Sequence, residues 1–187
     1  MIKFLYSENS KIKLFQVSNN NSDIDVSKYA KENNLNILRI GFEQVRKNPF
    51  NTWFYQQLNF PYQYSFDYFQ IPDLQSKGEE LEEHLCKYYS ANKDGYILVH
   101  NQSHEDTYEL NNISNKDIIY ISKNSDLFNN MFYYKTLIVN AKEIHCINSS
   151  FLHLVERVKT HSKLYYHDVR NSNFELSEKW NVINYDN

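Results

Sequence analysis

The chain has 187 residues, a hydrophobic fraction of 41% and a formal net charge of −3. This length is enough for one well-packed core, and the interspersed acidic and basic residues exclude the basic stripe of a nucleic-acid-binding surface. The sequence contains no run of about 18 apolar residues, and its start, MIKFLYSENSKIK, lacks the apolar core of a signal peptide. We therefore expect a cytoplasmic protein without a membrane span and without a nucleic-acid partner.

Glycine and cysteine usage exclude several kinds of site. Glycine occurs only at positions 41, 78 and 95, so neither a G-x-G-x-x-G turn nor a Walker loop can be written. Cys86 and Cys146 give neither a disulfide framework nor zinc-ligand spacing. We expect no metal site and no cofactor.

Short apolar runs and helical periodicities alternate along the chain. The runs predict strands at 12–17, 36–42, 96–100, 118–122, 143–147 and 163–167. The periodicities predict helices at 24–33, 52–58, 79–89 and 126–139, and a further helix beginning near residue 150. This alternation is typical of a mainly parallel sheet with helices packed on its faces.

The last of these helices has the cleanest pattern. Its apolar residues follow an i, i+3, i+4, i+7 rule, and the neighbouring Glu156, Arg157 and Lys159 are expected on the opposite side. The segment 48–75 is different, because it is crowded with aromatic residues and carries all three prolines. It is interpreted either as an aromatic connection that covers one side of the sheet or as a stacking surface for a sugar or base.

Polar residues follow two of the expected parallel strands, and ligands of open α/β sheets bind outside the carboxyl ends of strands. Strand 143–147 ends at Asn148, and Ser149 or Ser150 is placed to cap the next helix. A hydroxyl and the first backbone N–H groups of that helix can bind a phosphate, or the hydroxyl can simply cap the helix. The sequence leaves both interpretations open.

Strand 96–100 offers a second candidate at the same edge. It runs into His100 and Asn101, which begin a polar loop, and His100 either donates to a phosphate oxygen or bonds only to the backbone. Lys123 follows strand 118–122 and is the cation expected at this edge. Glu143 and His145 alternate with apolar neighbours and so share one face of their strand, with His145 nearer the ligand edge. A metal pair would need further ligands, which the sequence does not position.

Several stretches carry a resemblance to a known family: LRIGFE (38–43), FYQQLNFPYQYSFDYFQIP (54–72), YILVH (96–100), LFNNMFYYKTLIVNAKEIHCINSSFLHLVERV (127–158) and KLYYHDVR (163–170). Together they resemble the C-terminal half of bacterial and phage-associated GT-B glycosyltransferases, with the fucosyltransferase-like branch as the nearest relative. The strand-to-helix junction at 141–151 is the most specific of these stretches.

This resemblance implies a Rossmann-like, three-layer α/β/α domain at 36–187 that binds a nucleoside-diphosphate sugar, usually without a metal. It implies that Ser149, Ser150 and the amide of Phe151 bind the donor diphosphate, with Asn148 and His100 beside it. About 35 residues precede LRIGFE, so residues 1–35 are expected to be a remnant of, or a lead-in from, an N-terminal α/β domain that would bind the acceptor.

Two functions follow as expectations. In the first, the chain is a glycosyltransferase or its donor-binding domain, incomplete and inactive alone, with no catalytic base assigned. In the second, it is a non-catalytic Rossmann-like module that forms an oligomer through its aromatic segment, with Trp53, Phe54 or Tyr68 at the interface.

Overall fold

The structure is a computed structural model that describes residue 6 and the ranges 9–18, 20–41, 49–72, 74–104, 106–172 and 174–185. The chain forms two compact units, Met1–Phe60 and Pro61–Asn187. The second unit therefore begins later in the chain than residue 36, where the resemblance placed the start of the α/β domain.

The first unit contains the helices α2 (Ser22–Glu32) and α3 (Phe50–Gln56), close to two of the expected ones. The expected strands at 12–17 and 36–41 are not strands, because these residues are not paired in a sheet, and residue 42 lies outside the described residues. Local contacts organise the unit instead. Phe15 stacks on Tyr29 with 4.3 Å between ring centroids, and the amide of Gln57 bonds to the backbone of Gly41 in both directions.

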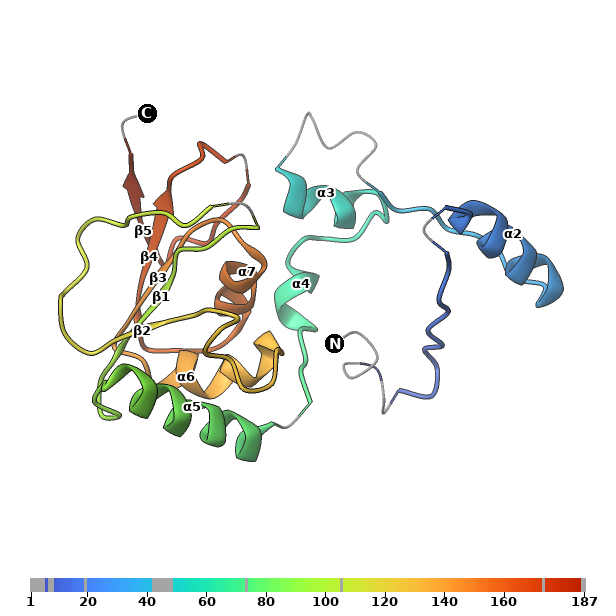
Figure 1. The fold of residues 1–187 in the computed structure, drawn as a ribbon. Helices are drawn as coiled ribbons and strands as arrows, with labels where there is room; N and C mark the ends of the chain where they lie inside the picture. Colours follow the sequence, from blue (N-terminus) through green and yellow to red (C-terminus); the bar gives the residue numbers. More distant parts are fainter. Residues whose placement is uncertain are drawn as a thin grey trace. The chain divides into compact units, whose positions relative to one another are not determined.

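The second unit is built on a five-stranded, entirely parallel sheet (Figure 1). Its strands are β1 (Ile97–His100), β2 (Ile118–Tyr120), β3 (Glu143–Cys146), β4 (Lys163–Asp168) and β5 (Trp180–Asn184), in the order β2-β1-β3-β4-β5. This confirms the expected Rossmann-like α/β fold with a parallel sheet. β5 was missed, because WNVIN contains no continuous apolar run, and it pairs with β4 over five residues.

Helices cover one face of this sheet (Figure 1): α5 (Gln75–Tyr89), the short 3₁₀ helix η2 (Met131–Tyr134), α6 (Lys135–Asn140) and α7 (Ser150–Arg157). Residues 126–130, expected to be helical, precede η2 without helical structure, with bends at 127–129. Gly78 permits the close approach of α5 to α6, since a Cβ at this position would overlap the Thr136 side chain. The core between helices and sheet includes Leu81, Leu98 and Ile144, all fully buried.

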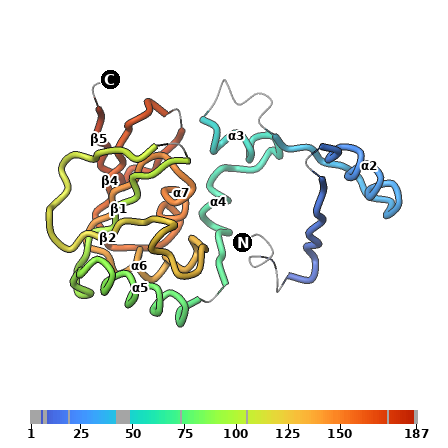
Figure 2. The backbone as a smooth tube through the Cα atoms, viewed as in Figure 1, coloured from blue at the N-terminus to red at the C-terminus, as the bar shows by residue number. Residues whose placement is uncertain are grey.

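The opposite face is crossed by the connection between β1 and β2, residues 101–117, which has no helix in its described residues. Crossover connections are right-handed, so a chain that moves from β1 to β2 must cross the other face from the chains that move towards β3, β4 and β5. Figure 2 shows this connection arcing out on the side of the sheet away from α7. The described residues therefore show one helical layer and one sheet, and the expected third layer is not confirmed.

The segment after Pro61 forms a further helix, α4 (Tyr64–Asp67), within the aromatic stretch. Arg157 fixes it to α7 by donating hydrogen bonds to the backbone oxygen and the hydroxyl of Ser65 (3.0 and 2.9 Å). The expectation that Glu156 and Arg157 face solvent was therefore wrong. The side chain of Glu156 is 3% exposed, because the connection between β4 and β5 folds over it, and its carboxylate accepts from the backbone N–H of Ser177 (2.7 Å).

No described helix is long and apolar enough to cross a membrane.

Candidate functional site

The strand order places a topological switch point between β1 and β3. The chain leaves β1 in one direction to form β2 and then returns across β1 to form β3, so the two neighbouring strands have connections on opposite faces. In parallel α/β sheets, this divergence opens a crevice at the carboxyl ends of the two strands, and ligands bind there. The two polar loops singled out from the sequence, after residues 100 and 147, are the loops that flank this point.

The loop after β3 leads directly into α7. Ser149 is the N-cap: its backbone is extended (φ −164°, ψ 167°), and its Oγ accepts a hydrogen bond from the backbone N–H of Leu152 (3.2 Å). Ser150 is exposed and begins the helix, while Asn148 is half-buried. The Ser149 hydroxyl therefore caps α7, and the Ser150 hydroxyl stands at a helix terminus whose first N–H groups carry partial positive charge.

The loop after β1 contacts the same terminus through an aromatic stack. The His100 imidazole lies against the Phe151 ring, with 5.4 Å between centroids and 14° between planes. Burial lowers the pKa of His100 to about 4, so the ring is neutral at physiological pH. It can donate or accept one hydrogen bond per nitrogen, but it brings no positive charge to the site.

Asn101 and Lys123 differ in their surroundings: the Asn101 side chain is hydrogen-bonded within its own loop, whereas Lys123 is exposed. The side-chain amide of Asn101 donates to the backbone oxygen of Tyr108 (2.8 Å), while the backbone N–H of Tyr108 donates to the backbone oxygen of Asn101 (2.9 Å), which closes the loop. Lys123 follows the carboxyl end of β2 by three residues and is exposed. Lys123 is the cation that the sequence analysis expected at this edge, and it follows β2.

Glu143 and His145 are not brought to this edge. Glu143 is the first residue of β3, at the amino end of the sheet. His145 is fully buried on the face opposite the helices, where its ring stacks on Tyr165 (4.6 Å between centroids) and its Nδ1 lies 2.9 Å from Nε2 of His167. The two residues do share one face, as their alternation predicted, and the Glu143 carboxylate lies 3.6 Å from His145 Nε2.

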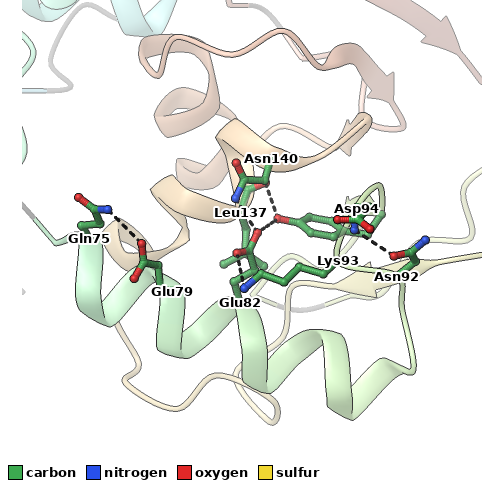
Figure 3. Close-up of polar contacts among 9 residues, drawn as sticks. Gln75, Glu79, Glu82, Asn92, Lys93, Asp94, Leu137 and Asn140 are labelled. Carbon is green, nitrogen blue, oxygen red and sulfur yellow. Dashed lines mark hydrogen bonds and ion pairs between the residues drawn. The ribbon is translucent and has the colours of Figure 1, made fainter.

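A second polar cluster, which the sequence did not reveal, lies at the amino edge. Glu82 on α5 is 1% exposed, and its Oε1 accepts from the Tyr96 hydroxyl (2.6 Å) and the Asn140 amide (2.8 Å). Lys93 approaches its other oxygen at 3.7 Å. Figure 3 shows the side chains of Glu82, Lys93 and Asn140 gathered beside Leu137 of α6, whose carbonyl also accepts from the Tyr96 hydroxyl (3.1 Å).

This amino-edge cluster borders a pocket of about 540 Å³, and four glutamates of α5 are among its lining residues. Each Glu82 oxygen has a protein partner, so the carboxylate serves to join α5, α6 and the start of β1. Burial and the bond to Glu82 raise the pKa of the Tyr96 phenol, which keeps it a neutral donor. The signal in the sequence was the position of Glu82 within the buried face of α5, between Leu81 and Leu85.

Among the described residues, no group of three or more His, Cys, Asp or Glu side chains is arranged to hold a metal ion. Comparison with known protein families, with curated proteins and with solved structures finds no match for the chain. The functional assignment therefore depends on the fold, the switch point and the residues around it.

Proposed function

We propose that the second unit is a nucleotide-sugar-binding domain of glycosyltransferase type, and that the donor diphosphate binds at the carboxyl edge between β1 and β3. The observation that carries the proposal is the coincidence of two independent features. The strand order sets the switch point between these strands, and the two polar loops flank that point. The sequence resemblance at 141–151 supports the same junction.

In this proposal the first turn of α7 binds the diphosphate. The Ser150 hydroxyl and the first N–H groups of the helix donate to phosphate oxygens, and the Ser149 cap fixes the loop in an extended conformation. His100, held by its stack on Phe151, offers a neutral donor, and Lys123 supplies the positive charge. Neither a glycine-rich loop nor a metal ion is needed for these contacts.

The chemical contribution of such a site is electrostatic. Glycosyl transfer leaves a nucleoside diphosphate with growing negative charge, and the helix terminus with Lys123 stabilises that charge as it develops. No described group at this edge is assigned as a general base. Acceptor binding would need a further surface, so transfer by this chain alone is not part of the proposal.

A ligand screen tests the proposal. The purified chain is heated with GDP, UDP, ADP and their sugars, with and without Mg²⁺. A ligand at 100 times its dissociation constant stabilises the folded state by about 2.7 kcal/mol, which raises the midpoint by a few degrees. A selective, metal-independent shift is expected, and the absence of a shift with every nucleotide would contradict the proposal.

A second candidate, an oligomerising module without catalytic function, is favoured by one observation in the aromatic segment. Tyr68 is 70% exposed and stands edge-on to Tyr64 with 5.1 Å between ring centroids. Trp53 and Phe54, in the first unit, are half-buried. Sedimentation velocity over a hundredfold concentration range distinguishes the candidates, since this module predicts an oligomer that Tyr68→Ser weakens, whereas the donor-binding domain requires none.

A further inference from the structure

A chain of polar contacts, buried at its two histidines, crosses the face of the sheet opposite the helices. The backbone N–H of Asn111 donates to the Tyr185 hydroxyl oxygen (2.8 Å), which lies 2.7 Å from Nδ1 of His167. Nε2 of His167 lies 2.9 Å from Nδ1 of His145, and Nε2 of His145 lies 3.6 Å from the Glu143 carboxylate. The two histidine rings are fully buried.

The order of donors in this chain follows from what each group can do. Tyr185 accepts from Asn111, so its own O–H is available to donate to His167 Nδ1. His167 then carries its proton on Nε2 and donates to His145 Nδ1, which leaves the His145 proton on Nε2, directed at Glu143. With both histidines neutral and in the Nε2–H tautomer, the contacts from Asn111 to His145 are satisfied, and the Nε2 of His145 lies 3.6 Å from Glu143, beyond hydrogen-bond distance.

The contact between the two rings admits only one proton. If both histidines were doubly protonated, N–H groups would face each other across 2.9 Å, and two positive charges would be buried side by side. A single added proton on Nδ1 of His167 makes His167 donate to Tyr185 instead of accepting from it. Only this one bond is reversed, because the two lone pairs of the Tyr185 oxygen can accept from both Asn111 and His167, whereas a second proton, on Nδ1 of His145, forces the two histidine rings apart.

At the Tyr185 end of this series of contacts, the hydrogen bond from Asn111 holds the connection 101–117 against the sheet. Asn111 is exposed apart from this hydrogen bond to Tyr185. A second clamp does not depend on the histidines: Nε of Arg170 donates to the Tyr108 hydroxyl (2.8 Å), and the guanidinium lies 5.1 Å from the centre of that ring. The middle of the connection is thus fastened by one proton-sensitive contact and one insensitive contact.

We propose that the His145–His167–Tyr185 chain is an acid-sensitive latch that holds the 108–117 part of the connection on the sheet at neutral pH and releases it when the histidine pair takes up protons. The latch does not depend on what the carboxyl edge binds. Since the same connection begins at Asn101, directly after β1, its release would also loosen the loop that follows His100 at that edge.

The charged groups around the pair favour a neutral state at pH 7. On β3, Glu143 attracts a proton to His145, but Lys163 on β4 shares that carboxylate at 3.9 Å. β4 contributes the stacked Tyr165. The β1 residues in register with Glu143 and His145 are the apolar Ile97 and Val99, and β5 is followed by Tyr185. Burial lowers the pKa of both histidines, that of His167 to about 4, and each disfavours charge on the other. The ionisable His, Asp, Glu and Lys side chains described on the connection, other than the half-buried Asp117, are exposed: His104, Asp106, Glu109 and Lys116.

Hydrogen exchange of the full chain at pH 7.5 and 5.0, corrected for the intrinsic pH dependence of exchange, tests the latch. The latch predicts that amides of 108–117 lose protection at pH 5.0 by roughly tenfold, while the amides of Leu98 and Ile144 stay protected. Tyr185→Phe should remove the difference between the two pH values by opening the segment at both. Arg170→Gln is the matched control, since it should loosen the segment by a similar factor at both pH values and keep the difference.

Three results would overturn the proposal: equal protection of 108–117 at the two pH values in the unmodified chain, simultaneous loss at Leu98 and Ile144, or unchanged exchange of Asn111 in Tyr185→Phe. Titration of the histidine ring protons by NMR gives a second reading that needs no variant. His145 and His167 should take up protons over the same pH range in which the segment opens. Opening without their titration would also contradict the latch.

Discussion

The imidazole of His100 and the phenyl ring of Phe151 lie nearly parallel, 14° apart, with 5.4 Å between their centroids. This contact joins the end of β1 to the first turn of α7 across the switch point. Phe151 is also packed edge-on against Tyr134 (5.8 Å between centroids), so the histidine rests on a ring that is itself fixed in the core. The β1 side of the candidate site therefore has a defined position before any ligand binds.

This stack has a consequence for stability in acid. The pKa of His100 is about 4 in the folded chain and near 6.5 when unfolded, so the unfolded chain binds the proton first as pH falls. His100 therefore leaves the free energy of unfolding at its full value above pH 6.5 and lowers it as the pH falls from 6.5 to 4. His100→Phe keeps a ring against Phe151 without a titrating group. Its free energy of unfolding in urea should fall less steeply, by up to about 1.4 kcal/mol per pH unit.

The control for that experiment is His104→Asn, which replaces an exposed histidine outside the stack. Measurements at pH 7, 6 and 5 are sufficient. An acid slope in His100→Phe equal to that of the unmodified chain would show that His100 is not the buried neutral group described above.

The N-cap of α7 separates a structural role from a binding role. Ser149→Ala removes the acceptor for the Leu152 N–H and should cost about 1 kcal/mol of unfolding free energy. Ser149→Asp retains a capping oxygen and should be nearly as stable as the unmodified chain, but its negative charge repels a phosphate. Denaturant unfolding combined with calorimetric titration of the nucleotide found in the screen checks both effects.

Ser150→Ala supplies the comparison, since Ser150 is exposed and its loss should weaken nucleotide binding with little change in stability. Unaltered nucleotide affinity in both Ser149→Asp and Ser150→Ala would remove the first turn of α7 from the site.

Glu82 makes a third prediction. Glu82→Ala deletes the acceptor shared by Tyr96 and Asn140 and leaves space between α5 and α6, so we expect a loss of about 2 to 4 kcal/mol of unfolding free energy. Glu83→Ala, at an exposed neighbouring position, should change it by no more than about 0.5 kcal/mol. Urea unfolding of the two variants measures both losses of unfolding free energy. Equal losses would show that the buried Glu82 carboxylate contributes no more to stability than the exposed carboxylate of Glu83.

The parallel α/β sheet could be predicted because short runs that contain Ile, Leu, Val or Tyr alternate along the chain with helical patterns. β5 could not be predicted, since the two asparagines in WNVIN interrupt any apolar run. Its pairing with β4 is a property of the sheet that the local sequence does not indicate. The converse error occurred at 12–17 and 36–41, where apolar residues alternate but are not paired in a sheet. Strand formation depends on a partner strand, which local sequence does not specify.

The candidate site was predictable in part for the same reason. The residues that end β1 and β3 could be named from the sequence, but the adjacency of these strands is a property of the sheet order. Whether Ser149 or Ser150 caps the helix depended on one backbone conformation, and the partner of His145 depended on the register between β3 and β4. The burial of Glu156 depended on the path of the later connection between β4 and β5.

The most direct test of the central claim is an NMR titration of the labelled chain with the nucleoside diphosphate that stabilises it most. If the donor binds at the switch point, amide shifts should change mainly at His100 and Asn101, at Lys123, and at 148–151. Shifts confined to other regions, such as the pocket between α5 and α6, or no shifts at millimolar nucleotide, would contradict the assignment of the carboxyl edge as the nucleotide site.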